Sequence, residues 1–116
     1  MSDVNLDRFL AICGPADEDV AALVAFFIPY MTDQLAALRA AGDDRRVHDV
    51  ELIAHRLAGS CGTYGFEPLV GPFAAIEREA RDGSLRDLAA RAREAEAVFA
   101  TIESALRDLA ARRSQP

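Results

Sequence analysis

The last third of the chain carries apolar residues at steps that alternate between three and four. This alternation keeps one face of an α-helix apolar over its whole length. It is also the spacing that left-handed packing of long helices requires, at crossing angles of about 20°. The pattern predicts a helix over residues 84–111, begun by a cap-like Ser84–Asp87 segment, that must bury its apolar face against other helices. The residues of this stripe are Leu85, Leu88, Ala92, Ala95, Phe99, Ile102, Leu106 and Leu109.

Breaks rich in glycine and acidic residues divide the rest of the sequence. Gly42–Asp44 and Asp82–Ser84 each place a helix-ending glycine before a good N-cap residue. Two further breaks fall at residues 13–19 and 62–68. The breaks leave five predicted helices, at about residues 3–12, 17–41, 44–64, 67–81 and 84–111.

Almost nothing in the sequence predicts a strand. Short turns between long helices place consecutive helices antiparallel. We therefore expect an all-α fold: an up-and-down four-helix bundle with a short extra N-terminal helix. It forms a single domain over residues 1–116, with its core at about 17–110. A dimeric coiled coil is the alternative, but alanine at Ala92 and Ala95 suits close packing within one chain better.

Two prolines and one glycine lie inside predicted helices. Pro29 lies inside the second helix, where the loss of one backbone hydrogen bond predicts a kink or a local break. Gly71 and Pro72 lie in the first turns of the fourth helix, which we expect them to distort.

Composition excludes several classes of function. The chain has 116 residues, 51% of them hydrophobic and 28% charged, which suits one soluble domain. The chain has a net charge of -6, so the negatively charged phosphate backbone of nucleic acid would repel it. No apolar run approaches the roughly 20 residues of a membrane span, and the N-terminus lacks the pattern of a signal peptide. We expect a cytoplasmic protein that binds neither nucleic acid nor membrane, with Cys13 and Cys61 as small apolar residues and not a disulfide.

His55 lies off the apolar stripe of its predicted helix. At about 100° per residue, Val50, Leu57 and Cys61 mark the centre of that stripe, and His55 falls about 130° away from it. We therefore expect its side chain to be exposed. Four residues later stands Gly59, which costs a helix interior roughly 1 kcal/mol relative to alanine.

That cost suggests a use. A residue without a side chain, one turn from an exposed histidine, lets the backbone of another molecule approach the imidazole. Ala58 and Gly62 are expected to extend the same clearing.

Three chemistries are open to such a histidine. A hydrolase triad fits poorly, because Ser60 points away from His55 on the helix. A metal site would use His48, Glu51 and His55, but the two histidines lie about 10 Å apart along the axis, and no second Glu-x-x-His occurs. The third chemistry is acceptance of a phosphoryl group on a ring nitrogen. It needs only an accessible neutral imidazole, while a partner brings the metal and the carboxylate.

The segment "AHRLAGSCGTYGFEPLVGPFAAIEREARDG", residues 54–83, resembles the histidine phosphotransfer (HPt) family. That family has a His-x-Leu-Lys-Gly-Ser pattern, a glycine-containing turn, and a helix with leucine at its start and a Leu-Glu-like pair further on. The resemblance spans about residues 17–105. The matching residues are His55, Leu57, Gly59, Ser60, Gly65, Leu69, Ile76 and Glu77.

The resemblance implies a phosphorelay intermediate of two-component signal transduction. His55 would be the phosphorylated residue, carrying the group between aspartates of response-regulator receiver domains, and Gly59 would be where the receiver packs closely. The implied partners are a receiver domain, a hybrid histidine kinase, or both. Mg²⁺ is expected on the receiver, and the chain, expected to be a monomer, would have no cofactor of its own. No nucleotide-binding motif is present, so we expect a phosphocarrier without autonomous ATP-dependent kinase activity.

One position departs from the family pattern. The family usually has lysine three residues after the histidine, and this chain has Ala58. Arg56 lies about 100° round the helix from His55, and Arg81 comes from the next helix; these two are the candidates to support the phosphoryl group. The departure leaves open a noncatalytic helical adaptor that binds a receiver or kinase domain without phosphotransfer. A degenerate histidine-kinase fragment is a further alternative, although nothing in the sequence forms an ATP site.

The predicted partner-binding face surrounds His55. Leu52 is its informative member, because an exposed leucine beside a reactive group would act as an apolar anchor for a transient partner. The residues of this predicted face are Glu51, Leu52, Arg56, Ala58, Gly59 and Gly62.

Overall fold

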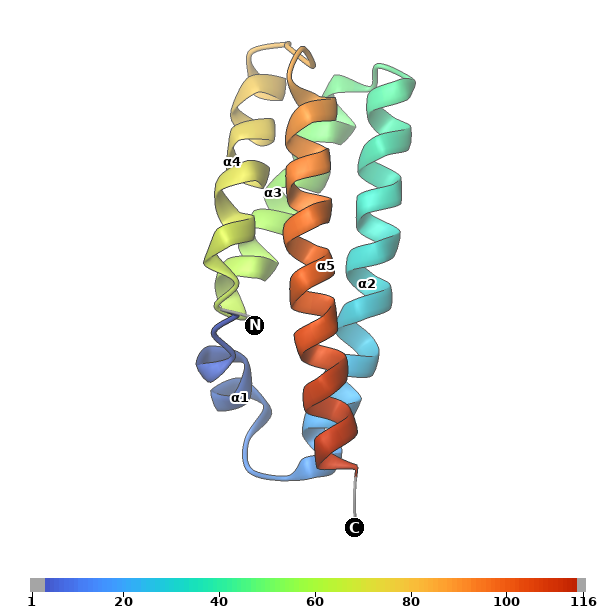
Figure 1. Ribbon diagram of the computed structural model, residues 1–116. Helices are drawn as coiled ribbons and strands as arrows, with labels where there is room; N and C mark the ends of the chain where they lie inside the picture. The colour runs from blue at the N-terminus through green and yellow to red at the C-terminus, as the bar shows by residue number, and fades with distance from the viewer. Residues whose placement is uncertain (1–3, 115–116) are drawn as a thin grey trace.

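The computed structural model describes residues 4–114, and within that range it contains helices and no strand (Figure 1). The fold is therefore all-helical, as the sequence predicts. The molecule is elongated, with extents of 51 × 24 × 19 Å. The helices are α1 (Asp7–Cys13), α2 (Asp17–Asp43), α3 (Val47–Thr63), α4 (Glu67–Arg81) and α5 (Leu88–Arg113).

The four long helices lie side by side along the long axis, and α1 lies at the end near the C-terminus of α3 (Figure 1). Consecutive long helices pack against each other, and α5 returns to pack against α2. The most extensive packing is between α3 and α4. These two helices form the part of the fold that positions His55.

The buried face of α3 is the one that the sequence predicts. Val50, Leu57 and Cys61 have no exposed surface. At the end of the core near α1, aromatic rings meet, with the Phe9 ring 5.8 Å from that of Phe66 and the Phe27 ring 5.2 Å from that of Tyr64. The turn between α3 and α4 is thereby fixed to the core at Phe66, which is 1% exposed.

Two predicted helix starts are wrong. The last helix begins at Leu88 and not at residue 84, because the Ser84 hydroxyl accepts a hydrogen bond from the Arg86 backbone N–H at 3.2 Å and so stabilises a turn before the helix. The third helix begins at Val47 and not at residue 44, because Arg45 has a φ of 57°, outside the right-handed helical region. The first helix begins at Asp7, so the expectation that residues 4–6 are helical is also wrong; residue 3, where we expect the helix to start, lies outside the described residues.

The local break expected at Pro29 is wrong, because α2 continues through Pro29, and α4 likewise continues through Pro72; the expected kink and the expected distortion of α4 stay predictions. A proline removes the hydrogen bond to the carbonyl four residues earlier. Those carbonyls belong to Ala25 and Pro68, both exposed residues, so water can replace the lost donor.

The apolar character of α2 corrects the expectation that no apolar run approaches the length of a membrane span. This helix contains an 18-residue window of mean hydropathy 1.5, so by length and composition alone it is apolar enough to cross a membrane. A core helix of a soluble protein passes the same test, and a third of the window, 33%, is buried inside the fold. The window is weak evidence for a membrane span.

Candidate functional site

His55 lies in the middle of α3 with its imidazole directed out of the core. Its side chain is 70% exposed, which confirms the position predicted from the helical wheel. The side chain of Ser60 does not approach it: the Ser60 hydroxyl lies 3.2 Å from the Tyr30 hydroxyl, between α3 and α2. The geometry therefore gives no support to a serine nucleophile paired with His55.

A carboxylate from the neighbouring helix holds the imidazole. Glu77 of α4 places Oε2 at 2.9 Å from His55 Nδ1, and its side chain is only 15% exposed. An ionised carboxylate can only accept hydrogen bonds, so the neutral ring donates from Nδ1 and keeps its lone pair on Nε2. Within residues 4–114, Nε2 has no hydrogen-bonding partner. The arrangement leaves Nε2 as the nucleophilic atom.

Arg81 completes a four-residue polar cluster, which we name the α3–α4 cluster: Glu51, His55, Glu77 and Arg81. Arg81 Nη2 donates to the same Glu77 Oε2 at 2.6 Å, and Arg81 Nε donates to Glu51 Oε2 at 3.2 Å. The hydrogen bond to Glu51 and the charge of Glu77 raise the pKa of Arg81 above its ordinary value. The guanidinium is a permanent cation that bridges two carboxylates.

The cluster follows from the antiparallel register of α3 and α4. Glu51 and His55 are one turn apart on α3, as Glu77 and Arg81 are on α4. His55 and Glu77 lie equally far from Phe66 in sequence, and so do Glu51 and Arg81. Symmetric spacing about the turn brings each pair together across the helix interface.

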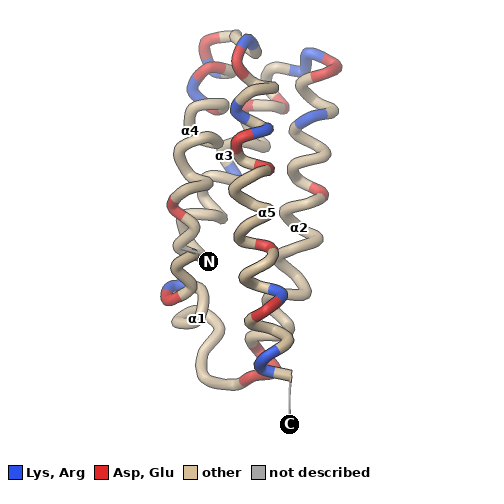
Figure 2. Tube along the Cα trace, viewed as in Figure 1, with Lys and Arg blue, Asp and Glu red and all other residues tan. Residues whose placement is uncertain are grey.

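Sequence reasoning missed the role of Glu77. In the sequence, Glu77 stands out only as part of the family pattern, although its symmetric spacing with His55 about the turn was a signal that could have found it. Figure 2 shows charged residues at the end of the bundle where the α2–α3 and α4–α5 loops lie. Arg81 ends α4 and Glu51 lies near the start of α3, so this ion pair lies toward that end.

Gly59 is open on the surface one turn from His55. A Cβ added at this position would meet no atom within 4 Å, so packing within this chain does not require glycine. By contrast, Gly62 is half-buried, and a Cβ there would lie 3.8 Å from Val70 Cγ2 of α4. Ala58 is also half-buried and packs against the core. The open part of the surface is at Gly59, while Ala58 and Gly62 are partly covered, and the expectation that they extend the clearing stays a prediction.

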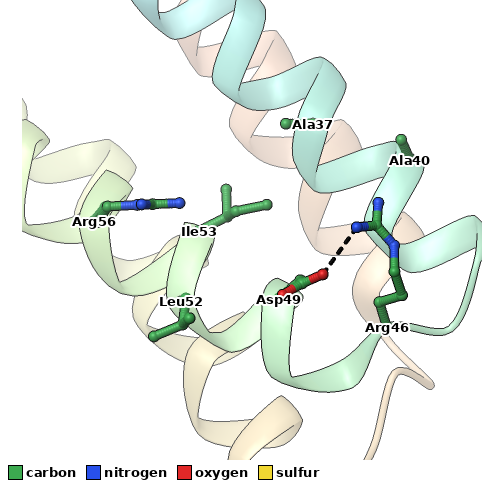
Figure 3. Close-up of a pocket in the computed structure, with 7 residues that line it drawn as sticks. All are labelled: Ala37, Ala40, Arg46, Asp49, Leu52, Ile53 and Arg56. Carbon is green, nitrogen blue, oxygen red and sulfur yellow. Dashed lines mark hydrogen bonds and ion pairs between the residues drawn. The ribbon is translucent and has the colours of Figure 1, made fainter.

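A shallow groove of about 370 Å³ lies on the other side of His55, between α2 and α3 (Figure 3). Leu52 contributes an exposed apolar side chain, 45% exposed, and Arg56 contributes an exposed guanidinium. Arg56 thus faces the α2 side of the helix, whereas Arg81 approaches His55 from the α4 side. The lining residues are Ala37, Ala40, Arg46, Asp49, Leu52, Ile53 and Arg56.

Metal and thiol chemistry find no support in the part of the chain that the structure describes. It contains no group of three or more His, Cys, Asp or Glu side chains that could hold a metal ion. Both cysteines are free. Burial raises the pKa of the Cys61 thiol to about 12 and also raises the pKa of the Cys13 thiol, so neither forms a thiolate readily.

The sequence matches the Hpt domain family over residues 22–113, a range that contains the whole α3–α4 cluster and Gly59. The chain belongs to the Hpt domain family. Neither a curated protein nor a solved structure matches the sequence. Membership implies a phosphotransfer role in two-component signalling, in which Hpt domains interact with receiver and kinase domains.

Proposed function

We propose that this Hpt domain is a phosphorelay intermediate that carries a phosphoryl group on Nε2 of His55 between aspartates of receiver domains. The observation that carries the proposal is the geometry of the imidazole. Nδ1 is bound to Glu77 at 2.9 Å, while the ring is 70% exposed beside the open backbone of Gly59.

The proposed transfer proceeds in line. The Nε2 lone pair forms a bond to the phosphorus of a receiver aspartyl phosphate, the P–O bond breaks, and its electron pair returns to the aspartate carboxylate. The hydrogen on Nδ1 stays against Glu77, whose negative charge offsets the positive charge that develops on the ring. Transfer to a second receiver reverses these steps. Mg²⁺ on the receiver would neutralise the phosphoryl oxygens, and the chain itself would supply no cofactor.

The proposed docking face follows from the two sides of His55. Gly59 would allow the closest backbone approach, and Leu52 would provide an apolar anchor at the rim of the α2–α3 groove. Glu51 and Arg56 would border the face, with Ala58 and Gly62 at its edge along α4. Arg56 and Arg81 are proposed to support the phosphoryl group, Arg56 directly from the α2 side and Arg81 through Glu77 from the α4 side.

We also propose that the four long helices form an up-and-down bundle that works as a cytoplasmic monomer. The packing of α2 on α3, α3 on α4, α4 on α5 and α5 on α2 supports this arrangement.

A labelling experiment tests the proposed function. The protein is incubated with a panel of phosphorylated receiver domains, and acid-labile label on the chain is followed. His55→Gln should abolish the label. His48→Gln, which removes the other exposed histidine of the same helix, should keep it.

The same experiment separates the relay from the adaptor. A receiver that binds wild-type protein tightly but never transfers label would favour the noncatalytic adaptor, and label that survives in His55→Gln would place the acceptor elsewhere.

A further inference from the structure

One carboxylate oxygen in the α3–α4 cluster serves two donors. Glu77 Oε2 lies 2.9 Å from His55 Nδ1 and 2.6 Å from Arg81 Nη2. The shorter contact is the one to the cation, and such charge-assisted bonds are the stronger kind. The guanidinium therefore takes part of the charge that Glu77 would otherwise present to the imidazole alone.

The charge on Glu77 matters most after His55 has been phosphorylated. A ring that carries the phosphoryl group on Nε2 and a hydrogen on Nδ1 is positively charged, and loss of that hydrogen makes the ring neutral. When water attacks the phosphorus, the N–P electron pair returns to Nε2. It returns more easily to a protonated ring, which then leaves as neutral imidazole. A bare carboxylate beside Nδ1 favours the protonated ring, whereas a carboxylate engaged by a guanidinium favours it less.

We propose that Arg81 is a positioning residue that prolongs the life of the phosphohistidine by engaging Glu77. This inference rests on the proposed function only in requiring that His55 is phosphorylated. Arg81 acts through Glu77 and needs no contact with the phosphoryl group.

Two features of this chain make Arg81 the residue for this role. Glu51 accepts a hydrogen bond from Arg81 Nε at 3.2 Å, which fixes the guanidinium across the helix interface while Nη2 reaches Glu77. Position 58, one turn from His55, is alanine and offers no charge of its own. Arg56 lines the groove on the α2 side and is not part of the cluster.

The test measures hydrolysis of phosphohistidine without any receiver. Phosphoramidate, a small phosphoryl donor, loads the full chain; the donor is removed, and loss of label from His55 is timed. Arg81→Gln should speed hydrolysis about two- to fivefold, the size expected of a partly exposed ion pair. Arg81→Lys should restore part of the lifetime, because an ammonium can still bind Glu77. Arg78→Gln removes the same charge from an exposed position of the same helix and should change nothing.

A double-mutant cycle separates this mechanism from a general charge effect. In a Glu77→Gln background, Arg81→Gln should have no further effect on hydrolysis, because the two residues act in series. An effect of Arg81→Gln that persists unchanged in that background, or an unchanged lifetime in the single variant, would overturn the proposal.

Structural damage is monitored independently. Nitrogen-15 spectra of the unphosphorylated imidazoles should show a changed Nδ1–H signal of His55 in Arg81→Gln, with the His48 signals unchanged. Equal changes at both histidines would indicate a disturbed helix and count against a positioning role.

The outcome also separates this inference from the proposed function. Loss of label transfer from every receiver, with an Arg81-dependent lifetime after phosphoramidate loading, would refute the relay and keep the inference. Label transfer from a receiver, with a phosphohistidine lifetime that does not depend on Arg81, would keep the relay and refute the inference.

Discussion

The two sides of His55 differ in what they present. On the α4 side, Glu77 is 15% exposed and Glu51 26% exposed, and both are already bound by Arg81. On the α2 side, an open groove is lined by Leu52 and Arg56. A side chain whose hydrogen bonds are satisfied within the fold is suited to orient a reacting group, whereas exposed apolar and charged side chains are suited to a transient partner. The difference supports our proposal that α4 orients the imidazole and that the partner contacts the outer and α2 faces of α3.

Gly59 offers the most direct test of this difference between the two sides of His55. Gly59→Gln should block transfer from a receiver almost completely while leaving the fold intact, because the added side chain points into open space in the free protein. Label transfer measures the first effect and thermal unfolding the second.

Gly65→Gln is the matched control. A Cβ at Gly65 would collide with the Arg8 side chain, and the backbone there has a φ of +83°, so this variant should destabilise the fold. Normal transfer by Gly59→Gln would show that the close-approach argument is wrong.

Glu77 tests the orienting side. Glu77→Gln should slow the transfer step about 10- to 100-fold, the value of a charge-assisted hydrogen bond, because an amide can donate to Nδ1 and then favours the wrong tautomer. Single-turnover transfer at saturating receiver separates this effect from docking. If Glu77→Gln weakens binding of the receiver but leaves the transfer rate unchanged, then Glu77 takes part in docking and does not orient the imidazole.

Leu52 tests the docking side. Leu52→Ala should raise the Kd for the receiver about fivefold, as expected for a contact worth about 1 kcal/mol, without changing the rate within the complex. Ile12 is the control, since it is also 45% exposed but lies on α1, away from His55. Equal effects of Ile12→Ala and Leu52→Ala on the Kd would argue against a specific anchor.

The smallest expected effect is on stability. Gly59→Ala should raise the free energy of unfolding by up to about 1 kcal/mol, because alanine is the better helix former and meets no obstacle. Denaturant unfolding measures this gain. A loss of stability would mean that the helix needs glycine for its own conformation and would remove the functional explanation of this residue.

The comparison also separates what sequence could and could not predict. The periodicity of apolar residues predicts the all-helical fold, the buried stripe of α3 and the exposure of His55, and the structure confirms all three. Those features depend on the regular 3.6-residue turn, which sequence spacing reports directly. The start of α5 was predicted four residues early, because the Ser84 hydroxyl can cap a turn as well as a helix, and local sequence does not distinguish the two.

Within the candidate site, the sequence was enough to predict an exposed histidine, His55, and an open position beside it, Gly59. Tertiary structure alone decided which residues meet His55. Glu77 and Arg81 reach His55 and Glu51 only because the turn at Phe66 sets the register of two antiparallel helices. The same packing places Gly62 beside Val70 of α4 and leaves Ala58 partly buried against the core. Spacing along one helix fixes the direction in which a side chain leaves that helix, but the neighbour it meets depends on how two helices dock, which is a property of the packed core.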